Sequence, residues 1–202
     1  MFVKICGITR AEDAAAAVAL GASAVGFIFW PGSPRFIDPY HARRIAAALP
    51  PFVTPVGVFV NEPPAHVNAV AGLVGLGAVQ LHGEETPDVL PFLRHPVVKA
   101  LTRVDQKTAS EWPAHVLMMI DAEDRVRRGG TGARADWQAA AGLGATRPVL
   151  LAGGIGPGNV LQAIEAVRPF GVDVSSAVER SPGVKDHDRL RELFDTLRAF
   201  RG

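Results

Sequence analysis

The chain has 202 residues, of which 48% are hydrophobic, and its 21 basic and 20 acidic residues give a formal net charge of +1. This length suits one domain with a substantial core and is short for two. The balanced charge, with no strongly basic run, argues against a nucleic-acid partner, and a single cysteine excludes an internal disulfide and a Cys-x-x-Cys metal site.

The N-terminal stretch MFVKICGIT lacks the long apolar region of a signal peptide, and no later run approaches the roughly 20 apolar residues of a membrane helix. We therefore expect a cytoplasmic protein without membrane association. We also expect no metal or other cofactor and a state of either monomer or homodimer.

Short β-branched or aromatic runs alternate along the chain with longer Ala- and Leu-rich stretches of helical spacing. Strands are predicted at residues 2–6, 24–29, 54–60, 78–82, 97–101, 116–121, 148–154 and 170–175. Helices are predicted near residues 11–20, 39–49, 64–73, 86–94, 105–111, 135–142, 158–167 and 187–200. Several strands are nearly all apolar, which is typical of a parallel sheet covered on both faces.

Eight strand–helix units predict an α/β fold, a (β/α)8 or TIM barrel, as a single catalytic domain over residues 1–202. An open doubly wound sheet is the alternative, and it would more often carry a Gly-x-Gly-x-x-Gly turn after the first strand. Here the first strand ends in Cys6-Gly7-Ile8-Thr9, which favours the barrel.

Polar residues collect where the predicted strands end. In a barrel the catalytic groups come from these C-terminal ends and the loops that follow, because they surround one mouth. The residues concerned are Cys6 after the first strand, Arg35 after the second, His82 at the end of the fourth, Asp121 at the end of the sixth and Asp173 near the end of the eighth.

Strand alternation places Lys4 on the same face as Cys6, and we expect both Lys4 and Lys99 to point into the barrel. A charge in that position needs a partner, for which Asp173 is available. A lysine ammonium nearby would also favour the thiolate of Cys6.

Each of these residues also has a purely structural interpretation. Cys6 could be a buried apolar filler, and Asp121 could be a helix cap or a turn residue. His82, followed by Gly-Glu-Glu, could start a helix, and Arg35 could clamp its own loop to a carboxylate. Their joint placement at one mouth favours the functional interpretation.

Two glycine- and serine-containing loops follow the seventh and eighth strands, at residues 153–159 and 175–179. This is the usual phosphate site of a barrel, where glycine permits close backbone approach, and the alternative is a pair of ordinary tight turns. Neither loop has the pattern of a nucleoside triphosphate site. The glycine-rich segment 127–132 is either a lid or a plain surface loop.

The chain resembles phosphoribosylanthranilate isomerases through motifs that run almost end to end. They are KICGIT at 4–9, GFIFWPGSPRFI at 26–37, VGVFVN at 56–61, VQLHGEE at 79–85, ID at 120–121, GGTG at 129–132, DW at 136–137, LAGGI at 151–155 with PGNV at 157–160, and GVDVSSAVERSPGVKD at 171–186.

The resemblance implies an aldose–ketose isomerase of tryptophan biosynthesis, with Cys6 as general base, Asp121 as general acid and Arg35 bound to the anthranilate carboxylate. It implies further that His82, Gln80 and Asp173 line the substrate mouth and that Gly153, Gly154, Ser175 and Ser176 bind phosphate. Two positions depart from the family's usual pattern. Ala177 stands where many members have glycine, and Ala135 stands where phenylalanine is common.

The implied reaction is an Amadori rearrangement of N-(5-phosphoribosyl)anthranilate, in which the substrate's own iminium serves as the electron sink. It requires a protonated acid and an ionised base, so we expect burial to keep Asp121 protonated and positive charge to ionise Cys6. The alternatives are the sugar-phosphate isomerase of histidine biosynthesis, the indole-forming synthase and a non-catalytic metabolite-binding protein. Cys6 argues against both of these enzymes, and the presence of both Cys6 and Asp121 argues against a non-catalytic binding protein.

Overall fold

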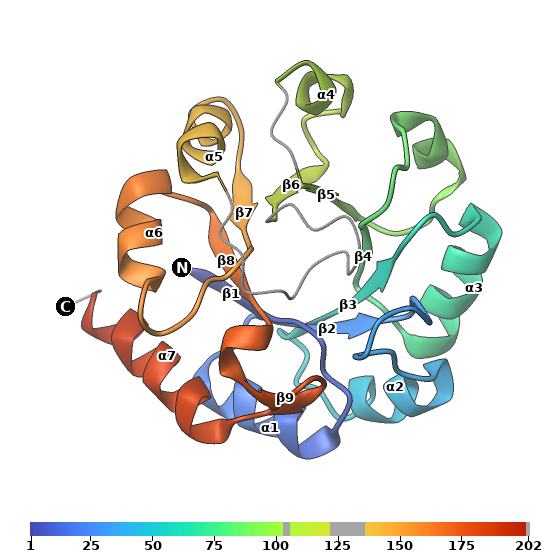
Figure 1. Ribbon diagram of the computed structural model, residues 1–202. Coiled ribbons are helices and arrows are strands. Elements are labelled where there is room, and N and C mark those ends of the chain that lie inside the picture. Colours follow the sequence, from blue (N-terminus) through green and yellow to red (C-terminus); the bar gives the residue numbers. More distant parts are fainter. Residues whose placement is uncertain (103–105, 122–135, 201–202) are drawn as a thin grey trace.

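A computed structural model describes residues 1–102, 106–121 and 136–200. Eight parallel strands close into a barrel in sequence order, with β8 paired to β1 (Figure 1). The strands are β1 Phe2–Ile5, β2 Ala24–Ile28, β3 Thr54–Phe59, β4 Ala78–Leu81, β5 Val97–Leu101, β6 Leu117–Ile120, β7 Val149–Leu151 and β8 Gly171–Val174. The predicted single-domain barrel is therefore confirmed.

Helices form a ring outside the barrel (Figure 1). They are α1 Ala11–Leu20, α2 Pro39–Ala46, α3 Pro64–Val74, α4 Gln106–Glu111, α5 Trp137–Gly144, α6 Val160–Val167 and α7 His187–Ala199, with short 3₁₀ helices η1 Pro87–Phe92 and η2 Ser176–Val178. The local sequence determines where several of these helices begin or end. The Asp38 carboxylate accepts hydrogen bonds from two N–H groups of α2, Pro39 occupies its first turn, and Gly21 closes α1 in the left-handed conformation.

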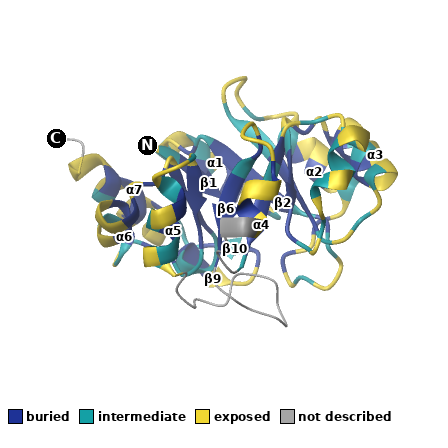
Figure 2. Cartoon of the chain, turned by 90° about the horizontal axis from the view of Figure 1, so that it is seen from above, coloured by how far each residue is buried: buried dark blue, intermediate teal, exposed yellow. Residues whose placement is uncertain are grey.

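The buried residues form two layers. The larger one lies between strands and helices and includes Val3, Ile5, Phe27 and Leu151. A smaller cluster of Ala100, Met119, Leu150 and Ala152 is separate from it. Alternation along the strands puts this cluster inside the barrel, where it fills the interior. Figure 2 shows the strands dark with burial and the outward sides of the helices exposed.

One predicted helix takes a different form. Residues 86–94 contain the 3₁₀ helix η1, because Pro87 starts the segment and Pro91 lies inside it, where a proline cannot donate the hydrogen bond that an α-helix needs. The two-stranded hairpin of β9 Glu179–Ser181 and β10 Val184–Lys185 was not predicted. The segment 127–132 and Ala135 lie outside the described residues.

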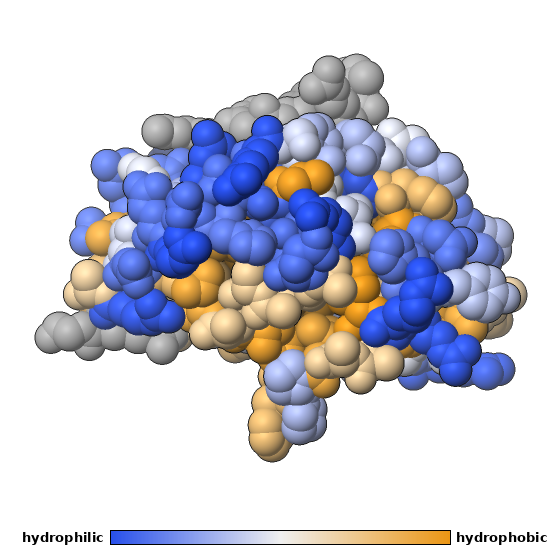
Figure 3. All heavy atoms as spheres, turned by 90° about the horizontal axis from the view of Figure 1, so that it is seen from below, coloured by the Kyte–Doolittle hydropathy of each residue, from blue (hydrophilic) through white to orange (hydrophobic). Residues whose placement is uncertain are grey.

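The surface seen in Figure 3 is hydrophilic over most of its upper part and more apolar toward its lower side. Large exposed apolar side chains of the described chain include Phe52, Phe92 and Phe170, and Phe170 stacks on Phe2. Within the described ranges, no helix has the length and hydropathy needed to cross a membrane.

Candidate active site

An ion pair between Lys4 and Asp173 lies inside the barrel. The two residues face each other in the β1–β8 register, and Lys4 Nζ lies 2.9 Å from Asp173 Oδ1. Both side chains are buried, at 2% and 8% exposure. Burial raises the pKa of Asp173 above its ordinary value against the opposing charge of Lys4. The predicted inward position of Lys4 and its pairing with Asp173 are confirmed.

Cys6 follows β1 directly and is held by its backbone. Its N–H donates to the Val174 carbonyl at 2.9 Å, while its carbonyl accepts from Lys185 Nζ at 2.6 Å and from Ser175 Oγ at 3.2 Å. A Cβ on Gly26 of the neighbouring strand would lie only 2.7 Å from Cys6 Sγ. The thiol therefore occupies space that exists because residue 26 has no side chain.

Burial raises the pKa of the Cys6 thiol above its ordinary value, although the charge of Lys4 opposes this effect. The expected positive charge is thus present and favours the thiolate as predicted, but it does not outweigh burial, so the expectation that it would ionise Cys6 is wrong for the free protein. The physical reason is that desolvation of the charged form is the larger effect at a fully buried site.

Gln80, His82 and Asp121 form a row at the same end of the barrel. Gln80 Nε2 lies 2.8 Å from His82 Nδ1, and because an amide nitrogen only donates, Nδ1 accepts. A neutral His82 then carries its proton on Nε2, which lies 3.4 Å from Asp121 Oδ2. All three side chains are buried.

Asp173 links the two halves of this site. Its titration responds to the charges of Lys4, Asp121 and His82, and that of Cys6 responds to Lys4 and Asp173. Such coupling between buried groups requires short separations. The structure therefore brings the predicted residues Cys6 and Asp121 to one buried polar cluster.

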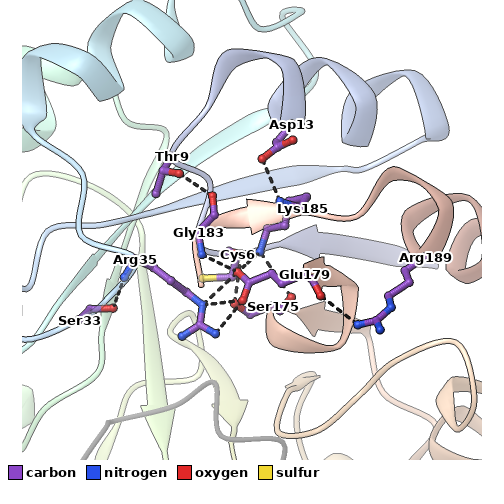
Figure 4. A network of polar contacts seen from close by, with 10 residues as sticks. All are labelled: Cys6, Thr9, Asp13, Ser33, Arg35, Ser175, Glu179, Gly183, Lys185 and Arg189. Atoms are coloured by element: carbon purple, nitrogen blue, oxygen red, sulfur yellow. Dashed lines mark hydrogen bonds and ion pairs between the residues drawn. The ribbon is translucent and has the colours of Figure 1, made fainter. Parts of the chain in front are cut away.

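Arg35 is buried and paired with a carboxylate of this chain. Its Nε lies 3.0 and 3.1 Å from the two carboxylate oxygens of Glu179, and its Nη2 lies 2.7 Å from Oε2 (Figure 4). The structural interpretation of Arg35, that it clamps to a carboxylate, therefore applies to this structure. A Cβ on Gly7 would lie 2.7 Å from Arg35 Cδ, so the arginine stem passes directly beside the Cys6 segment.

The loops after β7 and β8 lie against each other. Gly153 and Gly154 have φ of 77° and 66°, a left-handed conformation that glycine adopts without strain. Asn159 braces this loop, since its side chain accepts from Gly156 N–H and donates to the Gly154 carbonyl. A Cβ on Gly156 would lie 2.6 Å from the Cβ of Ala177. Ser175 and Ser176 precede Ala177 at the start of η2.

Lys99 does not point into the barrel, which corrects the prediction. It pairs with Leu81 in the β4–β5 register, and Leu81 belongs to the layer under the helices. Its Nζ lies 2.7 Å from Glu85 Oε2 and 2.7 Å from the Gly83 carbonyl, with the Trp112 ring 5.7 Å away. Alternation along β5 instead turns Val98 and Ala100 inward.

Glu179 and Lys185 received no role from the sequence, although both are buried beside Cys6. The available signal was a pair of charged residues flanking Ser-Pro-Gly, a typical turn, immediately after the predicted phosphate loop. The role of Gly26 could not be predicted from the sequence, because the residue that it faces after the adjacent strand β1 depends on the register of the two strands.

The family model of N-(5'phosphoribosyl)anthranilate (PRA) isomerase matches residues 3–196. An N-(5'-phosphoribosyl)anthranilate isomerase of Pelobacter propionicus is 45% identical over 201 residues, covering 98% of this chain and 96% of the relative. The crystal structure of phosphoribosyl anthranilate isomerase from Thermus thermophilus is 44% identical, with a TM-score of 0.92 and complete coverage of both chains. A phosphoribosyl anthranilate isomerase in complex with reduced 1-(o-carboxyphenylamino)-1-deoxyribulose 5-phosphate is 41% identical, with a TM-score of 0.86 and coverage of 98% and 99%.

Proposed function

Since the chain belongs to the N-(5'-phosphoribosyl)anthranilate isomerase family, we propose that Cys6 is the general base and Asp121 the general acid of this reaction. The reaction converts N-(5-phosphoribosyl)anthranilate to 1-(2-carboxyphenylamino)-1-deoxyribulose 5-phosphate, a step of tryptophan biosynthesis. The observation that carries the proposal is that Cys6 and Asp121 are both buried where their strands end at one mouth of the barrel, with the Lys4–Asp173 pair nearby and His82 Nε2 3.4 Å from Asp121 Oδ2.

Asp121 starts the reaction by protonating the ring oxygen of the ribose. The C1′–O bond breaks, the anthranilate nitrogen donates its electron pair to C1′, and a C1′ iminium forms. His82 Nε2, 3.4 Å from Asp121 Oδ2, helps to orient the carboxyl group, and Gln80 orients His82 through Nδ1. Orientation of this kind keeps the acid in line with the oxygen that it protonates.

Cys6 then removes the C2′ proton, which the iminium has made acidic. The electron pair of that C–H bond forms the C1′–C2′ double bond and neutralises the nitrogen, giving an enolamine that tautomerises to the ketone. The thiolate is the competent base. Lys4 lowers the free energy of the thiolate against the cost of burial, so its ammonium supports the step without transferring a proton.

Two further contacts hold the substrate. Arg35 binds the anthranilate carboxylate through the guanidinium edge that Glu179 does not occupy. Gly153, Gly154, Ser175 and Ser176 bind the phosphate, with the left-handed glycines giving the backbone close access. Anchors at both ends fix the sugar between acid and base.

Turnover of N-(5-phosphoribosyl)anthranilate, followed by its fluorescence, tests the assignment. We expect Cys6→Ser and Asp121→Asn each to lower kcat by about 10²- to 10⁴-fold while KM changes little, because each removes a proton-transfer group that acts mainly in the transition state.

Glu192→Gln on the exposed side of α7 is a matched control that should keep wild-type kinetics. Near-normal kcat in either site variant would remove that residue from its role. Absence of turnover by the wild-type chain, together with failure to complement a tryptophan-requiring host that lacks this step, would refute the function itself.

A further inference from the structure

The hairpin of β9 and β10 is tied to the segment that carries Cys6. Thr9 Oγ1 donates to the Gly183 carbonyl at 2.5 Å, and Lys185 N–H donates to Asp13 Oδ2 on α1 at 2.9 Å. On its other side, Arg189 of α7 donates to the Glu179 carbonyl at 2.9 Å. These bonds bring Glu179 and Lys185 beside the Cys6 backbone and Ser175 (Figure 4).

Glu179 connects two cations. Its Oε1 lies 3.0 Å from Arg35 Nε and 2.7 Å from Lys185 Nζ, and its Oε2 lies 2.7 Å from Arg35 Nη2. The Lys185 side chain is fully buried, and the side chains of Glu179 and Arg35 are 4% and 9% exposed. A buried carboxylate that accepts this many charge-assisted hydrogen bonds fixes the orientation of its donors.

A guanidinium has two edges that can each receive a carboxylate, one through Nε and Nη2 and one through both Nη atoms. Glu179 occupies the first edge of Arg35. Among the described residues, the edge of Arg35 that includes Nη1 is the one left for a carboxylate of the substrate. Glu179 thereby fixes the orientation of the Arg35 guanidinium and the direction in which its second edge points.

The charges of the three side chains do not cancel. Arg35 and Lys185 carry positive charges and Glu179 a negative one, so these three buried side chains together carry one excess positive charge, while burial lowers the pKa of Lys185. An unbalanced buried charge is costly, and a substrate carboxylate at Arg35 would balance it. Lys185 also donates to the carbonyl of Cys6 at 2.6 Å, so the same ammonium supports the segment that carries the base.

We propose that Glu179 and Lys185 are positioning residues of the isomerisation, an inference that rests on the proposed function. Glu179 holds Arg35 with its free edge toward the carboxylate of the substrate. Lys185 keeps Glu179 in place, supplies the positive charge that this carboxylate neutralises, and holds the backbone of Cys6. Selectivity for a substrate that bears a carboxyl group therefore depends on the hairpin as well as on Arg35.

The test measures binding of two ligands by calorimetry. One is reduced 1-(o-carboxyphenylamino)-1-deoxyribulose 5-phosphate, and the other is the same compound without the carboxyl group. For Glu179→Gln and for Lys185→Met we expect the first ligand to bind about tenfold more weakly and the second to change less than about twofold. The ratio of the two affinities is taken on the same folded molecules, so a general loss of stability does not produce the effect.

A double variant separates positioning from direct binding. If Glu179 acts through Arg35, then Arg35→Ala with Glu179→Gln should bind the carboxylated ligand no more weakly than Arg35→Ala alone. Arg180→Met is the matched control, because it removes a cation from the same hairpin but from a side chain that is 64% exposed. It should leave both affinities unchanged.

Two outcomes would overturn the inference. In one, the two hairpin variants lose affinity for both ligands by the same factor. In the other, the losses of binding free energy caused by Arg35→Ala and by Glu179→Gln add in the double variant. Wild-type turnover of N-(5-phosphoribosyl)anthranilate is measured alongside. Unaltered ligand discrimination in an active enzyme would reject only the hairpin's role, whereas an inactive wild-type chain would reject the proposed function.

Discussion

The thiol of Cys6 is subject to two opposing effects at the scale of a single residue. Burial destabilises its charged form, and the ammonium of Lys4 stabilises it, with the net result that its pKa lies above the ordinary 9.0. A base of this kind is mostly protonated near neutral pH. Its activity should therefore depend on how many molecules have lost the proton.

We expect the thiolate fraction of Cys6 to stay small up to about pH 9 and to rise as pH approaches the raised pKa, because the charged form carries the cost of burial. The ultraviolet absorbance of the thiolate in a series of buffers provides the measurement, with Cys6→Ser as the blank. A thiolate absorbance already complete near neutral pH would contradict the prediction.

Residue positions at strand ends were largely predictable from sequence, because alternation and the barrel rule together place Lys4, Cys6 and Asp173 near one another. Lys99 shows where this reasoning fails. It is a charged residue on a strand, but the register with β4 turns it outward to Glu85. A charge can be buried on either side of a barrel wall if a partner is present, so its sign and burial do not identify the face.

Among the secondary-structure elements, the eight barrel strands were predictable in number and order, whereas the hairpin and the loops that complete the site were not. β7 ends at Leu151 rather than at residue 154, because Gly153 and Gly154 adopt left-handed conformations that a strand does not contain. The hairpin of β9 and β10 is too short for a periodic signal. Its position beside Cys6 depends on hydrogen bonds to Thr9 and Asp13, which are distant in sequence.

The close contact between the loops after β7 and β8 contributes to the stability of the fold. Gly156→Ala should lower the free energy of unfolding by about 1–3 kcal/mol, since the added methyl group would overlap the Cβ of Ala177, 2.6 Å away. Urea denaturation of the purified variant measures the loss.

Ala177→Gly provides the internal control for this clash. Combined with Gly156→Ala, it removes the atom that the new methyl group meets, so the double variant should recover most of the lost stability. A double variant that is as unstable as the sum of the two single changes would show that the two loops do not compete for this space.

At the scale of the whole molecule, stability in acid depends on buried ion pairs outside the active site. Burial alone would raise the pKa of Glu85, but Lys99 and the N–H groups of Asn61 and of Glu85 itself outweigh it, so the pKa lies below its ordinary value. A carboxylate with a lowered pKa adds stability that is complete above the unfolded-state value of about 4.3. That stability is lost as pH falls through the folded-state value.

Glu85→Gln should therefore lower the free energy of unfolding by about 3–5 kcal/mol at pH 7, because it removes the buried carboxylate that lies 2.7 Å from the Lys99 ammonium. The difference from wild type should shrink steadily as pH falls below about 4.3. Denaturant titrations at pH 7, 5 and 3.5 give the two curves. A gap of constant size across this range would show that the carboxylate charge is not what stabilises the region.

The bare position at Gly26, opposite the sulfur of Cys6, restricts how this chemistry can arise on related scaffolds. In a related barrel whose second strand carries a side chain at this position, the sulfur of a cysteine introduced at the end of the first strand would overlap that side chain. Such a barrel needs two substitutions, one that adds the thiol on the first strand and one that replaces the facing residue of the second strand by glycine. The same two changes are needed whether the activity is transferred by engineering or arises in evolution.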